Sequence, residues 1–361
     1  MLFKMKFSIC IPNFNYQAYI GKTIQSVLNQ TYQDFEILIA DNASTDSSVE
    51  IIKSFNDPRI KLQINKINIG FGPNLLKAAS MASGNYMLML SSDDLMLPNA
   101  LETYHQILQS LGERGNKVVL CSKAQIINEN DEQINYLQID RKLWNQANNE
   151  EELTKLINNP VYGLSAEILL QSSFLLMRNP VYVCTILYPK CLHDQVESYY
   201  HGSLINPDKR FGWELLGVAE KAYFVDEALF SYRVHNNNQG SQQVKMGAIK
   251  HHIDEYVATI NVQESLLKKA NINRQQLVDA FIEQDIALRG LKFLGEGNSL
   301  LARRILHFGL ATYPKVASKN TKVKLLKLLL FTGFIGQFIS QKLLIVGSRY
   351  WNNQIQKITS T

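Results

Sequence analysis

Two adjacent aspartates, Asp93 and Asp94, follow a short apolar run from Tyr86 to Leu90. Neighbouring carboxylates at the end of a buried strand repel each other, and a hard divalent cation relieves that repulsion. Mg²⁺ and Mn²⁺ prefer oxygen ligands and keep coordination positions open for substrate phosphates. The pair therefore indicates a metal site for a phosphate-bearing ligand. The alternative is a loop that caps a helix beginning near Pro98.

A second polar cluster, Asp41 to Asp46, follows the apolar run from Phe35 to Ala40. Asp41 comes directly after that run, where its carboxylate can accept hydrogen bonds from a nucleotide base or from ribose hydroxyls. Ser44 to Asp46 can cap the helix that follows. The alternative is that the whole cluster consists of turn and cap residues.

The first apolar run, Phe7 to Ile11, leads into Pro12 and Asn13 rather than into a glycine-rich turn. A dinucleotide-binding fold needs such a turn, and Gly21 alone does not supply it, so an NAD-dependent enzyme is a distant alternative. Gly21-Lys22-Thr23 lacks the first glycine of the Gly-x-x-x-x-Gly-Lys-Ser/Thr motif, because Tyr16 stands at that position, so a P-loop is excluded. Bound phosphates therefore need another source of positive charge, and the aspartate pair offers one through a metal.

Short apolar runs alternate with helical patterns in the amino-terminal part, which is typical of βαβ units and a mainly parallel sheet. The predicted strands are 7–11, 35–40, 59–64 and 86–90, and the predicted helices are 20–29, 47–55 and 73–82. Ligands bind beyond the carboxyl ends of strands in such a sheet. We therefore expect residues 12–15, 41–46 and 91–94 to line one crevice.

The remaining chain changes from strands to helices. Strands are predicted at 118–127 and 174–177, a helix at 150–157, and a strand pair at 222–225 and 229–234 before a turn-rich run at 235–240. Helices are predicted at 250–270, 274–294, 299–311 and 321–345. We therefore expect an α/β domain over residues 1–240 and a helical region over residues 241–361.

The composition, with 46% hydrophobic residues among 361, is sufficient for a large core. The start of the chain lacks the pattern of a signal peptide, so we expect a cytoplasmic protein. The four cysteines show no paired spacing, which favours reduced thiols over zinc ligands or disulfides. They are Cys10, Cys121, Cys184 and Cys191.

Positive charge gathers at the carboxy-terminal end. No aspartate or glutamate follows Glu296, whereas ten lysines and arginines do, in a chain of net charge +5. The apolar stretch 325–347 is interrupted by lysine and glutamine, so a spanning helix is not expected. Residues 303–349 combine this charge with phenylalanines, as helices at anionic membrane surfaces do. The alternative is a helix packed on the domain; nucleic acid is not expected as a partner.

Several motifs occur in a fixed order along residues 5–240. They are Ser8-Ile9-Cys10-Ile11-Pro12-Asn13-Phe14-Asn15, Asp41-Asn42-Ala43-Ser44-Thr45-Asp46, Asn68-Ile69-Gly70 with Asn74, Ala82-Ser83-Gly84-Asn85-Tyr86 and Leu90-Ser91-Ser92-Asp93-Asp94. In this succession the chain resembles the family-2 glycosyltransferases of the GT-A fold. The resemblance implies a domain that binds a nucleotide sugar and transfers its sugar.

The resemblance also implies residue roles. Asp41 would contact the base, commonly uracil, and Asp93 would bind the metal that bridges the diphosphate, supported by Asp94. His235, in Tyr232-Arg233-Val234-His235, is a further candidate metal ligand, unless it is simply a solvated loop residue. The family's metal motif usually opens with another aspartate, where this chain has Ser91. The residues implied around the nucleotide sugar are Pro12, Asn13, Asn15, Asp41, Asn42, Gly70, Asn74, Ser92 and Asp93.

The catalytic base is the remaining element. An inverting transferase needs a carboxylate to take the proton of the acceptor hydroxyl. Many relatives place an acidic pair where this chain has Phe211 and Gly212. Asp208 is therefore the first candidate, and Glu214 and Asp194 are the alternatives.

These features predict an inverting glycosyltransferase that uses Mn²⁺ or Mg²⁺. It would move a sugar from a nucleoside-diphosphate donor, most simply a UDP-sugar, to a hydroxyl of a glycan or lipid-linked acceptor. The alternative is a module of the same fold that binds a sugar nucleotide or glycan without turnover, which Ser91 and the missing acidic pair permit.

Overall fold

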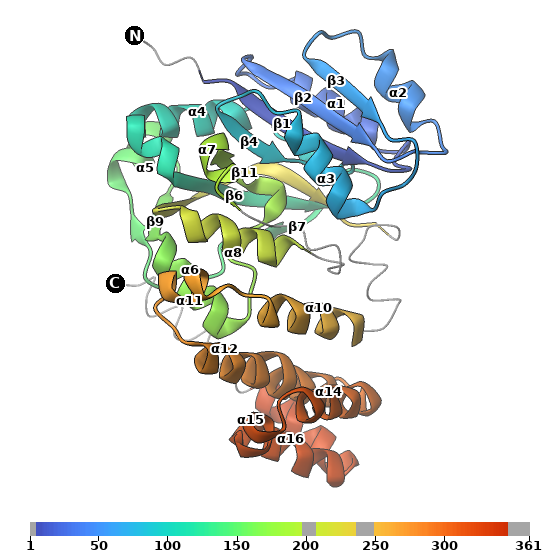
Figure 1. The fold of residues 1–361 in the computed structure, drawn as a ribbon, viewed down its shortest axis with the longest axis vertical. Helices are drawn as coiled ribbons and strands as arrows, with labels where there is room; N and C mark the ends of the chain where they lie inside the picture. The colour runs from blue at the N-terminus through green and yellow to red at the C-terminus, as the bar shows by residue number, and fades with distance from the viewer. Residues whose placement is uncertain (1–4, 197–206, 236–248, 346–361) are drawn as a thin grey trace. The chain divides into compact units, whose positions relative to one another are not determined.

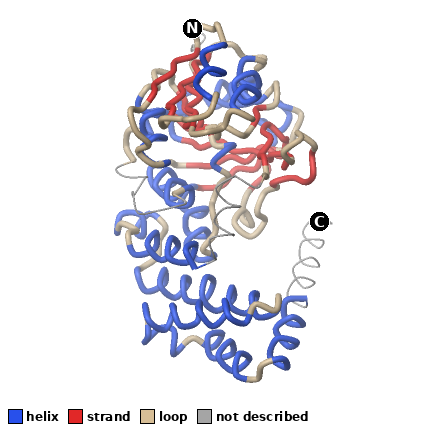
Figure 2. The backbone as a smooth tube through the Cα atoms, turned by 90° about the vertical axis from the view of Figure 1, so that its right-hand side faces the viewer, coloured by secondary structure: helices blue, strands red, loops and turns tan. Residues whose placement is uncertain are grey.

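The computed structural model describes residues 5–196, 207–235 and 249–345 (Figure 1). The chain divides into two compact units. The first comprises Met1–Ser173, Arg178–Gln242 and Lys268–Asn271, and the second comprises Phe174–Met177, Gln243–Leu267 and Ile272–Thr361. Among the described residues, all strands belong to the first unit, and the second is helical (Figure 2). The expected boundary at residue 240 and the turn at 236–240 lie outside the described residues.

A mixed sheet forms the centre of the first unit. Its described strands are β1 (Phe7–Asn13), β2 (Phe35–Asp41), β3 (Ile60–Ile64), β4 (Tyr86–Met89), β5 (Leu95–Met96), β6 (Val118–Ile127), β7 (Gln133–Leu137), β8 (Asn148–Asn149), β9 (Val161–Ser165), β10 (Leu187–Pro189) and β11 (Lys221–Arg233). Their order is β3-β2-β1-β4-β10-β6-β11-β9-β8, with β5 paired to β11 and β7 to β6. Neighbouring strands from β3 to β4 are parallel, as are β6 and β11. The predicted mainly parallel sheet is thus confirmed.

Helices pack around this sheet. In the first part of the chain they are α1 (Ile20–Leu28), α2 (Ser48–Ser54), α3 (Phe71–Ser80), α4 (Ala100–Leu111), η1 (Gly112–Lys117), α5 (Glu151–Ile157), α6 (Ala166–Leu176), η2 (Val183–Thr185), α7 (Lys190–His193) and α8 (Asp208–Val218). Ile20, Ile24 and Val27 of α1 recur at helical spacing and pack in one core with Phe7 and Ile9, which alternate along β1. The period of the apolar residues thus sets both elements.

Two sequence predictions in the middle of the chain are wrong. Residues 174–177 are not a strand, because Phe174 continues a buried stripe with Leu169, Leu170 and Ser173 at the spacing of a helix, α6. Residues 222–234 are not a strand pair. They form the single strand β11, which stays paired with β6 through register shifts between Val225 and Phe230.

The carboxy-terminal helices also differ from the predicted set. They are α10 (Ile249–Ile260), α11 (Glu264–Lys269), α12 (Arg274–Phe281), the π-helical segment η3 (Ile282–Leu288), α13 (Arg289–Gly295), α14 (Ser299–Thr312), α15 (Pro314–Lys319), α16 (Thr321–Phe331) and a helix over 334–345. The predicted helix 321–345 breaks at Thr332 and Gly333, where Gly333 has a φ of 59°. None of the described helices is long and apolar enough to span a bilayer.

Candidate active site

The carboxyl ends of β1, β2 and β4 lie side by side. Asn13 at the end of β1 is in register with Asp41 at the end of β2, and β4 lies on the other side of β1. The chain builds outward from β1 to β3 and then returns to β4, so the strand order reverses at β1. Ligands of open α/β sheets bind at such a switch point.

The loop after β4 is held by hydrogen bonds from two neighbouring elements. The Ser92 hydroxyl donates to the carbonyl of Pro12 at 2.6 Å. The Thr23 hydroxyl of α1 lies 2.9 Å from the carbonyls of both Ser92 and Asp94. Sequence reasoning missed Thr23, whose only signal was a polar residue on the otherwise apolar face of α1.

Asp93 meets His235 within this loop. His235 Nε2 lies 3.0 Å from Asp93 Oδ2, and both residues are buried. The antiparallel pairing of β5, just after Asp93, with β11, just before His235, brings them together. The ring of Tyr19 lies 4.7 Å from the imidazole ring, centroid to centroid, and that of Tyr16 lies 6.1 Å from it. These contacts hold the imidazole beside the carboxylate.

The Asp93–His235 pair fits a divalent ion. Adjacent ligands of an octahedral ion with bonds of about 2.0 to 2.1 Å are about 2.9 Å apart, close to the separation found here. Among the described residues, no group of three or more His, Cys, Asp or Glu side chains is placed to hold a metal. Two protein ligands nevertheless suffice for Mg²⁺ when substrate phosphates complete its coordination.

Asp94 faces the protein interior. Its Oδ1 accepts a hydrogen bond from the backbone N–H of Arg233 at 2.9 Å. Burial, followed by the negative charge of Asp93, raises the pKa of the Asp94 carboxyl well above its usual range. This geometry favours a structural role in joining the Asp93 loop to β11, and metal binding by Asp94 stays a prediction.

Arg233 is the main site residue that sequence reasoning missed. It is fully buried, and its Nε donates to the carbonyl of Asp93 at 2.7 Å. Its guanidinium also bonds to the carbonyl of Asn128, pairs with Asp131 at 2.5 Å and lies over the ring of Tyr19. The permanent positive charge of Arg233 thus lies against the backbone of Asp93. The available signal was a charged residue at the end of a strand otherwise rich in apolar residues, two residues before the candidate ligand His235.

The carboxylate of Asp41 is buried and bonded within the protein. It accepts hydrogen bonds from the Asn13 amide at 2.8 Å and from the Ser44 hydroxyl and backbone N–H at 2.6 and 2.9 Å. A carboxylate has about four acceptor positions, so about one remains. Asn15, exposed beside this group, accepts the N–H of Thr45 at 2.8 Å. Nucleotide contact by Pro12, Asn13, Asn15 and Asp41 stays a prediction.

Side-chain amides connect the turn after β2 to α3. Asn42 accepts bonds from Asn65 and from the N–H of Ile69, and it donates to the carbonyl of Gly70. Asn74 accepts from Asn65 and donates to the carbonyl of Ala40. Gly70 has a φ of 90°, which only glycine adopts readily. The predicted ligand contacts of Asn42, Gly70 and Asn74 are untested, but their role in shaping this loop is evident.

The three candidate bases lie in different surroundings. Asp208, in the first turn of α8, is partly exposed, and burial raises its pKa to about 6. Glu214 forms a buried ion pair with Arg210 on the same helix. Asp194 is exposed and pairs with Lys190 at 2.7 Å. Asp208 is the candidate best suited to accept a proton near neutral pH.

Asp208 shares its surroundings with the aspartate pair. The pKa of Tyr232 is raised mainly by burial, and the charges of Asp94, Asp93 and Asp208 add to the shift. The pKa of Cys184 is raised by burial and by the charges of the same three carboxylates. Asp208 and the aspartate pair thus act on the same two side chains, although they are far apart in sequence.

The fold of the chain is that of the GT-A class. It resembles the crystal structure of S. aureus TarS 1–349 in complex with UDP-GlcNAc, with a TM-score of 0.58 and 17% identity over 96% of this chain and 92% of that one. It also resembles a Pyrobaculum calidifontis mannosyltransferase in complex with GDP-Man and Mn²⁺, with a TM-score of 0.50 and 12% identity over 94% and 87% of the two chains.

Residues 8–176, just under half of the chain, match the model of glycosyl transferase family 2. The matched range contains Asp41, Asp93 and Asp94 but not Asp208, Glu214 or His235.

Three relatives illustrate the similarity. Over 123 residues the chain is 36% identical to the Escherichia coli UDP-Glc:alpha-D-GlcNAc-diphosphoundecaprenol beta-1,3-glucosyltransferase WfgD, covering 34% of this chain and 47% of that protein. It is 27% identical over 229 residues to a Rickettsia typhi glycosyltransferase, covering 63% and 64%. It is 34% identical over 127 residues to the Salmonella typhimurium abequosyltransferase RfbV, covering 34% and 37%. The match thus spans less than two thirds of each relative.

Proposed function

We propose that the protein is an inverting glycosyltransferase that moves a sugar from a UDP-sugar to a hydroxyl of a glycan or lipid-linked acceptor. The observation that carries this proposal is the Asp93–His235 pair after β4, beside the switch point of the sheet; the charges of Asp93 and Asp208 both raise the pKa of Tyr232. The E. coli relative is named for a UDP-Glc donor and a diphosphoundecaprenol acceptor, which supports this donor and acceptor class.

Asp93 and His235 would hold Mn²⁺ or Mg²⁺. When bound, such an ion would neutralise the charge of the departing diphosphate. Arg233 would keep the Asp93 loop in position from behind through its bond to the Asp93 carbonyl. Asp41 would contact the nucleoside through its remaining acceptor position.

Asp208 would act as the base. The acceptor oxygen forms a bond to the anomeric carbon while the bond from that carbon to the diphosphate oxygen breaks. The proton of the acceptor hydroxyl passes to the Asp208 carboxylate. A pKa of about 6 leaves most of this carboxylate ionised at pH 7, yet basic enough to accept the proton.

A binding module without turnover is the second candidate. Ser91 at the start of the metal motif and Phe211-Gly212 in place of an acidic pair favour this alternative. Release of nucleoside diphosphate distinguishes the two functions. The full chain with Mn²⁺, a panel of UDP-, GDP- and dTDP-sugars and candidate acceptors should release nucleoside diphosphate from one donor. Donor binding in a thermal-shift assay without release from any pair would instead establish the binding module.

We further propose that the protein works in the cytoplasm, at the inner face of the membrane. The basic residues from Arg303 onward and the exposed Phe331, Phe334 and Phe338 support this location. Residues 346–349 of the proposed membrane-contacting segment lie outside the described residues. Sedimentation of the full chain with anionic vesicles tests this location without requiring turnover.

A further inference from the structure

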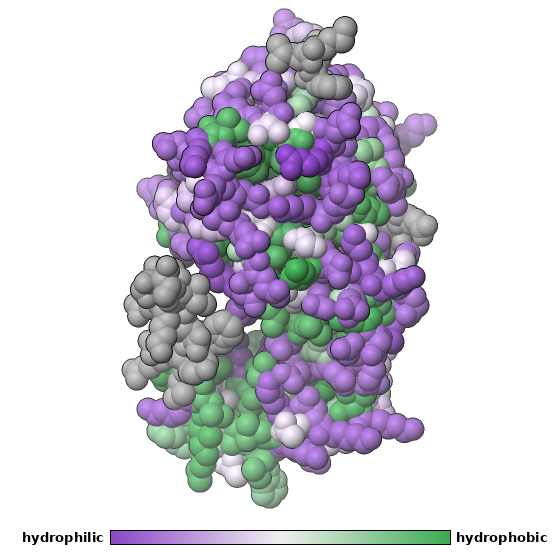
Figure 3. Space-filling view, turned by 90° about the vertical axis from the view of Figure 1, so that its left-hand side faces the viewer, coloured by the Kyte–Doolittle hydropathy of each residue, from purple (hydrophilic) through white to green (hydrophobic). Residues whose placement is uncertain are grey.

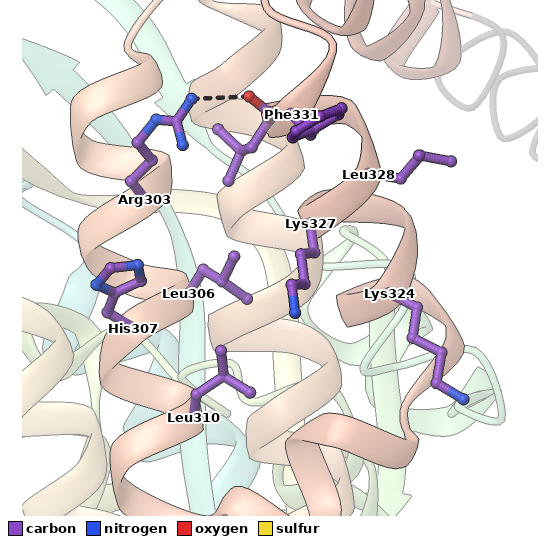
Figure 4. A pocket seen from close by; sticks show the side chains of 9 residues that line it. Arg303, Leu306, His307, Leu310, Lys324, Lys327, Leu328 and Phe331 are labelled. Atoms are coloured by element: carbon purple, nitrogen blue, oxygen red, sulfur yellow. Dashed lines mark hydrogen bonds between the residues drawn. The ribbon is translucent and has the colours of Figure 1, made fainter.

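An open pocket lies between α14 and α16 of the second unit (Figure 4). Its volume is about 630 Å³. One part of its lining is basic and the other is apolar. The lining residues are Arg303, Leu306, His307, Leu310, Lys324, Lys327, Leu328, Leu330 and Phe331.

The basic side chains come from both helices. Arg303 and His307 of α14 and Lys327 of α16 face the same space, whereas the ammonium of Lys324 points away from α14 (Figure 4). The Arg303 guanidinium donates one hydrogen bond, to the carbonyl of Leu330 at 2.7 Å. That bond fixes the head group and leaves most of its five donors for a ligand.

These cations lack acidic neighbours. Arg303, Lys324 and Lys327 form no ion pair with any described residue, and the chain has no acidic residue after Glu296. By contrast, Lys322 at the start of α16 pairs with Glu283 at 2.6 Å. Unneutralised cations that converge on one space favour an anion with several oxygen acceptors, such as a phosphate.

Exposed apolar side chains adjoin the pocket. Phe331, which lines it, is 87% exposed, and Phe334 and Ile335 in the next helix are 80% and 65% exposed. Phe338 continues this surface, and apolar side chains gather over the carboxy-terminal helices (Figure 3). An apolar surface of this kind marks a contact with a partner or with a membrane. A phosphate site beside it matches a molecule with an anionic head and a hydrocarbon tail.

We propose that this pocket binds the phosphate headgroup of an anionic phospholipid while Phe331 and Phe334 insert into the adjoining bilayer interface. This proposal rests on the proposed membrane location and specifies the lipid group that the pocket binds there. A second copy of the chain is a poorer occupant, because the pocket cations that form no ion pair with a described residue would repel their counterparts. Nucleic acid is also poorer, because its contact surface is polar where this one is apolar.

Vesicle sedimentation with the full chain tests the site. One set of vesicles contains phosphatidylglycerol in phosphatidylcholine, and the other contains phosphatidylcholine alone. The wild type should bind the anionic vesicles more tightly. The variant Arg303→Gln/Lys327→Gln should bind them roughly thirtyfold more weakly, at about 1 kcal/mol for each charge. Phe331→Ser/Phe334→Ser should weaken binding by at least about tenfold through lost apolar contact.

The matched control is Lys53→Gln/Lys155→Gln, which removes two exposed charges from the first unit. It should bind like the wild type, and thermal melting should show that all three variants are folded. If Arg303→Gln/Lys327→Gln behaves like this control while the phenylalanine variant loses binding, the headgroup site is overturned and the membrane location stands. Turnover with a soluble acceptor, measured separately, shows whether the proposed enzyme function holds.

Further measurements address the other occupants. Without vesicles, inorganic phosphate should shift the melting temperature no more than chloride does at equal ionic strength. A shift specific to phosphate and absent in Arg303→Gln/Lys327→Gln, with no preference for anionic vesicles in the wild type, would identify a free-phosphate site instead. Light scattering that shows a dimer in the wild type but not in Phe331→Ser/Phe334→Ser would assign the apolar surface to a second copy. Either result overturns the lipid proposal.

Discussion

Arg233 in the first unit and Arg303 in the second differ in burial and in the partners of their guanidinium groups. Arg233 is fully buried, and its guanidinium is bonded to backbone carbonyls and to Asp131. Arg303 is exposed, makes one hydrogen bond to a carbonyl and has no described acidic partner. Buried charges need partners because desolvation is costly, whereas exposed charges do not. The charge of Arg233 is therefore held in a fixed position, whereas the charge of Arg303 stays accessible at the surface of the second unit.

The largest expected effect is a loss of turnover when Asp208 of the first unit is replaced. Replacing it with asparagine should lower kcat by about 10² to 10⁴ and leave donor binding intact, because a general base acts on the chemical step. Nucleoside diphosphate release and donor thermal shifts measure the two effects. Asp279→Asn, an exposed acidic residue of the second unit, is the control. A loss in Glu214→Gln or Asp194→Asn but not in Asp208→Asn would reassign the base.

The pH profile sharpens the same prediction. Burial raises the pKa of Asp208 to about 6, so protonation below that pH removes the base. kcat/KM should therefore be nearly constant above about pH 7 and fall about tenfold per pH unit below about pH 5, provided that Asp208 titrates in the free enzyme. The residual activity of Asp208→Asn should lack this acid limb. A limb that persists unchanged in the variant would contradict the assignment.

Arg233→Met should destabilise the first unit by about 3 to 5 kcal/mol, because it leaves the buried carboxylate of Asp94 without a nearby positive charge and the carbonyl of Asp93 without its donor. Arg303→Met should cost about 1 kcal/mol, since it loses one hydrogen bond at the surface. Thermal melting of both variants measures the difference. Equal losses of unfolding free energy in the two variants would contradict the contrast between the buried, bonded Arg233 and the exposed Arg303.

Asp93→Ala should reduce turnover by about 10² to 10³ and remove the Mn²⁺-dependent part of the donor thermal shift, because charge stabilisation at the diphosphate is lost. His235→Ala should lower the same metal-dependent shift to a smaller extent. Glu151→Gln, exposed on α5, serves as the control. Unchanged metal dependence in Asp93→Ala would reject the metal site.

The smallest expected difference separates two glycines. Gly70→Ala should lower the free energy of unfolding by about 1 to 3 kcal/mol, because an alanine is strained at a φ of 90°. It should also weaken donor binding, because Gly70 lies in the loop before α3 that bonds to Asn42. Gly333→Ala should cost about 1 to 2 kcal/mol, because its φ is 59° and its added methyl group meets no atom within 4 Å. Donor titration and melting check both. Weakened donor binding in Gly333→Ala as well would argue against a loop-specific role of Gly70.

Local patterns in the sequence determined much of this protein. Short apolar runs predicted β1, β2 and β4, helical spacing predicted α1, and the polar residues after each strand predicted the ligand-binding edge. The motif order predicted a resemblance to family-2 glycosyltransferases, and the match of residues 8–176 to that family's model confirms the resemblance. These features depend on residues close in the chain, so they can be read without a fold.

The tertiary structure alone decided which side chains meet. Asp93 and His235 are 142 residues apart in sequence, and only the pairing of β5 with β11 brings them within 3.0 Å. Tertiary packing places the Arg233 guanidinium against the carbonyl of Asp93 and directs the Asp94 carboxylate toward the backbone N–H of Arg233. Burial raises the pKa of Asp208. Burial and partner choice arise from contacts between distant segments, and a local pattern of residues carries no information about them.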